Sequence, residues 1–225
     1  MCGRYTLRTP SKELAKAFGV EDVPEVEARF NIAPAQTVLG VRRTPDGREM
    51  KFLKWGLVPS WAKDTSMGAR LINARSETVG EKPAFRDAFK RRRCLIPADG
   101  FYEWKREGDR KQPYFFRLRE ERPFAFAGLW DRWQADGGEV VESCAILTTE
   151  VNAVLRPIHD RMPVILHPDD YETWLDDDVR KTDLLKELLR PYPAREMAGY
   201  PVSPTVNSAR SQGEQLIKRV PVNSL

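Results

Sequence analysis

The sequence is divided into many short segments typical of β-strands, with a few short helical patches between and after them. Strand-like runs of apolar residues are expected at 37–43, 49–57, 114–119, 124–133, 140–148 and 162–166. The first two runs flank Pro45-Asp46-Gly47, which favours the turn of a hairpin. Strands without a regular βαβ alternation predict an α+β fold. We expect a single domain over residues 1–225, with a mostly antiparallel sheet or barrel-like core and short flanking helices.

Apolar residues at helical spacing predict where the short helices lie. The first expected helix is capped and started by Thr9-Pro10, has Leu14, Ala17 and Phe18 on one face, and is ended by Gly19. The others are marked by Phe85–Phe89, by Tyr171–Leu175, begun by Pro168, and by Leu184–Leu189, closed by Pro191. None of them is long enough to organise the fold alone, so the strands carry the core.

Composition excludes several classes of protein. Hydrophobic residues at 41% and charged residues at 31% are typical of a folded globular chain of 225 residues. A net charge of +4 with 37 Lys and Arg suits a polyanionic partner. The cysteines Cys2, Cys94 and Cys144 form no CxxC pair, which argues against a disulfide framework or a structural zinc site and favours a reducing compartment. No signal peptide and no membrane-spanning run is recognised, so we expect a cytoplasmic protein in which Cys94 and Cys144 are inert buried thiols.

Cys2 stands at a position with particular chemical potential. Removal of Met1 would leave Cys2 with a free α-amine beside its thiol, a 1,2-aminothiol. An aldehyde would meet the amine as a Schiff base, and the thiol would close that imine into a thiazolidine ring. The unperturbed pKa values, about 8 for the amine and about 8.5 for the thiol, make both reactive forms accessible near neutrality. The alternative is a cysteine without a role on a frayed terminus.

Several segments fit neither the helical nor the strand period and combine polar residues with aromatic ones. They are Asn31–Pro34, Trp55–Trp61, Asn73–Glu77, Gly100–Trp104 and His159–Pro163. Functional residues concentrate on loops held by a rigid scaffold, so we expect these segments to be loops that build a site.

These motifs, in this order, resemble a known family. Met1-Cys2-Gly3-Arg4, Asn31–Pro34, Trp55–Pro59, Asn73–Glu77, Phe101–Trp104, His159–Pro163 and the late Val202-Ser203 and Val206-Asn207 element are similar to the SOS-response-associated peptidase (SRAP) family, also called abasic-site processing proteins. The resemblance runs from residue 1 to about residue 218. It implies a protein that crosslinks covalently, through its N-terminal cysteine, to abasic sites in single-stranded DNA.

The resemblance also implies catalytic roles. Cys2 corresponds to the nucleophile, and Glu103 to the acid/base residue, whose aromatic neighbours would raise its pKa toward neutrality. His159 would shuttle protons, and Asn73 would orient the α-amine of Cys2. The alternatives are a solvated glutamate in a turn, a hydrogen-bonded histidine at the start of a strand, and an asparagine that caps its own turn.

Further residues are expected to hold DNA. Arg4, Arg75 and Arg161 are candidate phosphate contacts, and Pro34 and Trp61 could stack on or wedge between bases, unless they belong to the core or its rim. Lys90–Arg93 is interpreted as a solvated helix end, with a contact to the DNA backbone as the less favoured reading. Cys2, Glu103 and His159 lack any familiar metal-ligand spacing, so no metal and no small-molecule cofactor are expected.

Three functions remain open from the sequence. The leading hypothesis is a monomeric, chromosome-associated sensor of abasic sites in single-stranded DNA, with Schiff-base lyase capacity and self-processing of Met1. The second is a cysteine peptidase that uses Cys2, His159 and Glu103. The third is a passive single-strand-binding module, whose binding salt would fully reverse.

Overall fold

The structure is a computed structural model that describes residues 2–179 and 181–221. Its centre is a closed barrel of five strands. The strands are β3 (Thr37–Thr44), β4 (Gly47–Trp55), β6 (Arg93–Ala98), β9 (Phe124–Gln134) and β10 (Val140–Glu150). The ring closes because β10 pairs with β9 on one side and with β4 on the other, where the pairing is parallel. The other three pairings are antiparallel, as expected.

Small side chains allow the barrel strands to approach closely. A Cβ at Gly128 of β9 would lie 2.8 Å from Sγ of Cys94, its partner on the antiparallel neighbour β6, so glycine is required at this position. Cys94 and Cys144 are free, buried thiols, and burial raises both pKa values above their ordinary range. The expectation that these two cysteines are inert is consistent with that burial.

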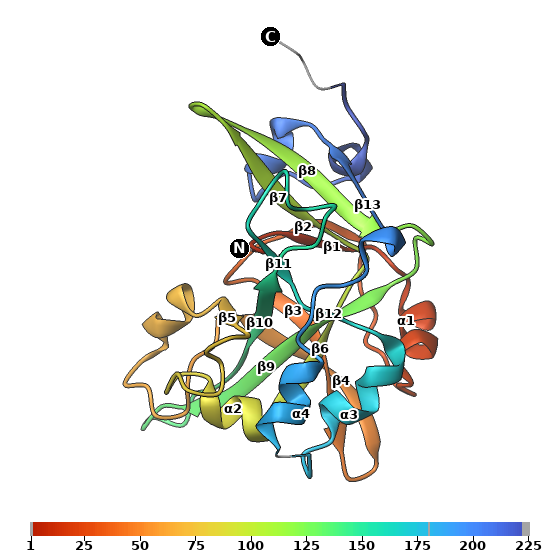
Figure 1. The fold of residues 1–225 in the computed structure, drawn as a ribbon. Coiled ribbons are helices and arrows are strands. Elements are labelled where there is room, and N and C mark those ends of the chain that lie inside the picture. The colour runs from red at the N-terminus through yellow and green to blue at the C-terminus, as the bar shows by residue number, and fades with distance from the viewer. Residues whose placement is uncertain (1, 180, 222–225) are drawn as a thin grey trace.

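A second, antiparallel sheet lies above the barrel in Figure 1. Its order is β13 (Met197–Pro201), β8 (Arg110–Leu118), β7 (Gly100–Glu107), β1 (Tyr5–Leu7) and β2 (Arg29–Ile32). The chain passes from the barrel into this sheet at Asp99, between β6 and β7. The buried Asp99 carboxylate accepts hydrogen bonds from the Thr6 hydroxyl at 2.5 Å and from the Arg8 amide at 2.6 Å. These bonds hold β1, and with it the N-terminal residues, against β7.

Three very short strands complete the sheets. They are β5 (Asn73–Arg75), β11 (Arg161–Pro163) and β12 (Ile165–Leu166). At the end of β10, β5 and β11 both pair with it, so that Thr148 is the partner of Arg75 and also of Pro163. Segments 73–75 and 161–163 are thereby brought to the same end of the barrel.

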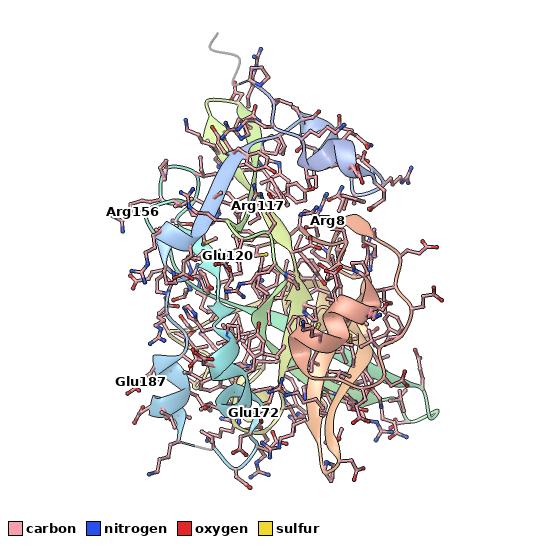
Figure 2. The ribbon with its side chains drawn as sticks, turned by 90° about the vertical axis from the view of Figure 1, so that its right-hand side faces the viewer. Arg8, Arg117, Glu120, Arg156, Glu172 and Glu187 are labelled. Atoms are coloured by element: carbon pink, nitrogen blue, oxygen red, sulfur yellow. The ribbon has the colours of Figure 1, made fainter. Side chains whose placement is uncertain are left out.

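The helices are short, as expected, and lie around the barrel (Figure 1). They are α1 (Ser11–Phe18), α2 (Arg86–Arg91), α3 (Tyr171–Leu175) and α4 (Thr182–Glu187), with 3-10 turns η1 (Thr65–Arg70), η2 (Pro168–Asp170), η3 (Ala194–Glu196), η4 (Pro204–Asn207) and η5 (Glu214–Ile217). Figure 2 shows Glu172 of α3 and Glu187 of α4 in the lower half of the molecule, with Arg8 and Arg117 higher up. Glu172 pairs with Arg48 and Arg43 of the β3–β4 hairpin and so ties α3 to the barrel. Among the described residues, no helix has the length and apolar character needed to cross a membrane.

The α+β, barrel-like fold class is confirmed, but some local expectations were wrong. Gly100–Trp104 is not a loop, because it forms the first half of β7. Phe101, Tyr102 and Glu103 are all buried, since a neighbouring layer covers each face of the strand, and this removes the alternation that would have marked it. Asn31-Ile32 and Asn73–Arg75 likewise lie in β2 and β5.

The basic run at 90–93 is also only partly a solvated helix end. Arg93 is 2% exposed. Its guanidinium donates to the carbonyl oxygens of Phe89 and Lys90, at the end of α2, and to that of Trp174 in α3. Arg93 thus satisfies carbonyl groups that helix ends leave without partners, while Lys90 and Arg91 are exposed.

Candidate active site

Cys2 lies in the interior of the molecule. Strand β1 pairs with β7 through Tyr5 and Phe101, and the Tyr102 amide donates to the Arg4 carbonyl at 3.0 Å. This pairing carries the chain inward, so Cys2 has 0% exposure and belongs to the main hydrophobic cluster. The structure therefore excludes a frayed terminus at Cys2.

The burial of Cys2 changes the reactivity of its thiol. Loss of water around the side chain raises its pKa well above the ordinary range, and the Glu103 charge raises it further. The expectation of a thiolate accessible near neutrality was therefore wrong. A base close to the sulfur must take the thiol proton as the sulfur reacts.

Glu103 is suited to that task. Its side chain lies on β7 with 2% of its surface exposed, and burial raises its pKa to about 7. The idle, solvated glutamate is thus excluded. A carboxyl group with a pKa near the working pH can both give and take a proton, which is what general acid–base catalysis requires.

His159 faces Glu103 from the segment before β11. Its Nε2 atom lies 3.9 Å from Oε2 of Glu103, and its Nδ1 accepts the Arg161 amide N–H at 2.9 Å. Burial lowers the pKa of His159, although the Asp160 carboxylate opposes this effect. The ring is therefore neutral near pH 7. Nδ1 also lies 3.0 Å from Oδ1 of Asp160, and Nε2 is the ring nitrogen that faces Glu103.

Glu103 and His159 meet at a cavity of about 490 Å³. Its lining residues are Gly3, Arg4, Glu103, Trp104, Arg106, Lys111, His159 and Asn207. Among the described lining residues, Arg4, Arg106 and Lys111 are cations and Glu103 is the one that has a carboxyl group. A volume of this size accepts a small ligand, and the charge favours an anionic one.

Asn73 lies on β5, at the neighbouring end of β10. Its Nδ2 donates to the Ile146 carbonyl at 3.3 Å, which fixes the orientation of the amide. Its Oδ1 is buried and has no hydrogen-bond partner in the described part of the chain. A buried acceptor without a partner costs about 1–3 kcal/mol. It would be satisfied by a donor such as an amine, and the role of Asn73 toward the Cys2 amine stays a prediction.

Two of the three arginines expected to bind phosphate already have protein partners. Arg4 donates to Oδ1 of Asn31 and to the Val206 carbonyl, both at 2.9 Å, and to the Asn207 carbonyl at 3.1 Å. Arg161 forms a fork with the Glu77 carboxylate, with Nη2 to Oε2 at 2.9 Å.

Arg75 differs from Arg4 and Arg161. It is exposed, and the structure assigns its side chain no hydrogen bond or ion pair. Phosphate binding by the three arginines stays a prediction, and Arg75 is the one whose guanidinium is available without losing a protein contact.

Pro34 and Trp61 lie on segments that meet at the end of β4. Pro34 is half-buried in the turn between β2 and β3, and the next residue, Ala35, donates its amide to the Trp55 carbonyl at 2.8 Å. Trp61 follows on the loop after β4 and is 56% exposed. A large indole ring in solvent is available for stacking, so contact of Trp61 with bases stays a prediction.

Two residues of the cavity, Arg106 and Lys111, were not predicted from the sequence. Both lie on the β7–β8 hairpin, where they are direct cross-strand partners. The available signal was Gly108-Asp109, a turn dipeptide in which Gly108 has a φ of +62°. In residues 2–179 and 181–221, no three His, Cys, Asp or Glu side chains gather closely enough to hold a metal ion.

Fold and site together define a class of protein. A small barrel joined to a second sheet brings a carboxyl group with a pKa near neutrality and a neutral imidazole to one cationic cavity, with a buried thiol on which the charge of that carboxyl group acts. These groups are suited to covalent catalysis on an anionic substrate.

Comparison with known proteins then identifies the family. The model of the family "SOS response associated peptidase (SRAP)" matches residues 1–209, and the chain belongs to this family. The chain is 41% identical over 222 residues to the abasic site processing protein YoqW of Bacillus subtilis, which covers 97% of this chain and 99% of the relative. It is 30% identical to the abasic site processing protein YedK of Escherichia coli, over 98% of this chain and 100% of the relative. A crystal structure of a protein from Bacteroides thetaiotaomicron superposes with a TM-score of 0.88 at 26% identity, over 98% and 100% of the two chains.

Proposed function

We propose that this protein senses abasic sites in single-stranded DNA and links to them covalently through Cys2. The observation that carries the proposal is that Glu103, whose charge acts on the buried Cys2 thiol, meets His159 at a cationic cavity. The names of the relatives YoqW and YedK as abasic site processing proteins support the same substrate. An abasic deoxyribose in its open form is an aldehyde between two phosphates, which matches a nucleophile in a cationic pocket.

The first step requires removal of Met1, so that Cys2 has a free α-amine. The amine attacks C1′ of the open sugar and forms a carbinolamine. Protonated Glu103 then gives its proton to the departing hydroxyl group, which leaves as water, and a protonated imine remains. His159 supports this step by moving protons between the sugar oxygens, Glu103 and solvent.

The second step closes the ring. The Glu103 carboxylate takes the proton of the Cys2 thiol while the sulfur attacks the imine carbon, whose electron pair moves to nitrogen. The products are a thiazolidine and protonated Glu103, ready for another proton transfer. The high pKa of the thiol makes this coupling necessary, because too little thiolate forms without a base.

The same intermediate accounts for the finer activities that we propose. An imine that is not closed by sulfur leads to β-elimination, which is lyase activity on the DNA. Self-processing of Met1 would use the same thiol and carboxyl group. Single-stranded DNA is the favoured substrate because the lesion need not be extracted from a duplex. We expect a monomer that associates with exposed single strands of the chromosome.

The general cysteine-peptidase alternative is not favoured. A peptidase nucleophile has a depressed thiol pKa, usually from a protonated histidine. Here burial moves the pKa of Cys2 upward, and His159 is held neutral.

Intact mass spectrometry after incubation with an abasic single-stranded oligonucleotide tests the proposal. We expect an adduct with the mass of the protein from Cys2 plus that of the oligonucleotide minus one water. An undamaged oligonucleotide of the same sequence is the control. If the abasic strand gives no adduct with protein that lacks Met1, the proposed chemistry is wrong.

A further inference from the structure

The outer half of the β7–β8 hairpin presents two positive charges directly opposite each other. Arg106 on β7 is the cross-strand partner of Lys111 on β8. Both side chains are exposed, and both line the cavity that contains Glu103 and His159. Like charges at such positions destabilise a hairpin, so their placement calls for an explanation.

The side chains that the structure describes do not neutralise the pair. Among the described side chains, no carboxylate lies within the 4.0 Å of an ion pair from either cation, and neither side chain makes a hydrogen bond. Arg4 and Arg161 differ in this respect, since their guanidinium groups already donate hydrogen bonds to oxygen atoms of the protein. Arg106 and Lys111 therefore keep their full capacity to bind an anion.

The base of the hairpin is held firmly, so the position of the two cations is defined. Trp104 is two residues before Arg106 and shares its face of the strand, because side chains alternate. The Trp104 indole donates to Oδ1 of Asn207 at 2.7 Å, which fixes the hairpin to the C-terminal segment. Beyond this contact the hairpin projects from the upper part of the molecule (Figure 1).

We propose that Arg106 and Lys111 form a phosphate clamp for the DNA strand at the mouth of the cavity. This inference rests on the proposed function, because it assumes that the anion is a DNA backbone. The clamp would hold a phosphate near the lesion while Cys2, Glu103 and His159 act on the sugar. Neither cation takes part in proton transfer, so the clamp contributes to binding and not to the chemical steps.

The test compares two double variants that remove the same charge. Arg106→Gln/Lys111→Gln removes the clamp. Lys90→Gln/Arg91→Gln removes two exposed cations from α2, at the opposite end of the molecule (Figure 1). Fluorescence anisotropy with an undamaged single-stranded oligonucleotide, at several salt concentrations, measures binding without any covalent step. The outcome therefore does not depend on whether the crosslink forms, which the abasic oligonucleotide tests separately on the wild type.

We expect the clamp variant to bind roughly tenfold more weakly at low salt and to lower the salt slope by about 1.4, twice the value of about 0.7 for one contact with a single strand. The α2 variant should bind like the wild type. At saturating abasic DNA, the clamp variant should form adduct at the wild-type rate. Its melting temperature should be equal or higher, because a repulsion has been removed.

Three results would overturn the clamp. They are an unchanged salt slope, an equal loss of binding in the α2 variant, and a clear fall in the melting temperature of the clamp variant. Inorganic phosphate, added at matched ionic strength, serves as a further probe. If it displaces the strand from the wild type but not from the clamp variant, DNA and free phosphate compete for the pair, as the proposal requires. If it binds the wild type but not the clamp variant and leaves the strand bound, the pair is a site for free phosphate and not for a DNA backbone.

Discussion

Nε2 of His159 lies 3.9 Å from Oε2 of Glu103, although the two residues are far apart in the sequence. The carboxyl group has a pKa of about 7 because it is buried, and the imidazole is neutral for the same reason. A proton that passes from the neutral carboxyl group to the neutral imidazole leaves a carboxylate and an imidazolium, whose opposite charges attract each other. This relationship makes Glu103 a reversible proton carrier beside Cys2.

The two functional groups of Cys2 should separate by mutation. Cys2→Ala keeps an α-amine once Met1 is removed, but it lacks the sulfur. It should still form an imine with the abasic aldehyde, which borohydride traps, but no adduct that survives heating. Gel electrophoresis with and without borohydride measures both. A heat-stable adduct made by this variant without reductant would place the linkage at another residue.

Replacing Glu103 by glutamine should slow formation of the adduct without weakening the binding of DNA. Loss of a general acid costs on the order of 10²–10⁴ in rate, whereas the neutral amide leaves the cationic lining intact. In the wild type, the rate should also fall as the pH rises above about 7, since the acid form is lost, and this limb should vanish in the variant. Quench-flow rates and anisotropy measure the two effects. A parallel collapse of rate and binding would show that Glu103 is structural.

The same substitution should stabilise the protein at high pH. The ordinary pKa of 4.5 is raised to about 7 in the fold, so the folded state holds a proton that the unfolded state loses between these values. The free energy of unfolding therefore falls as the pH rises from about 4.5 to 7, by roughly 3 kcal/mol in total. Glu103→Gln should match the wild type near pH 4.5 and exceed it above pH 7. Urea unfolding across this range measures the difference, and a gap independent of pH would refute the raised pKa.

Arg75 and Arg4 should respond differently to loss of charge. Arg75→Gln removes a guanidinium without a described partner, so it should lower the salt slope of binding by about 0.7 and leave the melting temperature unchanged. Arg4→Gln removes hydrogen bonds to Asn31 and to two carbonyl groups, so it should also destabilise the fold, by about 1–3 kcal/mol. Salt titrations and thermal melts of both variants test this. Equal melting temperatures would show that Arg4 does not brace the C-terminal segment.

Local patterns in the sequence determined much of the scaffold. The turn at Pro45-Asp46-Gly47 with flanking apolar runs predicted the hairpin of β3 and β4, and Gly19 marked the end of α1, where it adopts a φ of +62°. These features depend on neighbours in the chain, so the sequence displays them directly. The resemblance of the short motifs to a known family also implied that Cys2, Glu103 and His159 form one site.

Tertiary structure decided what these residues can do. The burial of Cys2, Glu103 and Arg93, the free charges of Arg106 and Lys111, and the partners of Arg4 and Arg161 all depend on segments distant in the chain. A pKa reflects the water and charge around a group, and a free cation is defined by the absence of a neighbouring carboxylate. The sequence by itself determined which chemical groups this protein has and in which order. Only the folded structure decided which of them lie in water, which are buried and which meet, because desolvation and contact arise from packing in space.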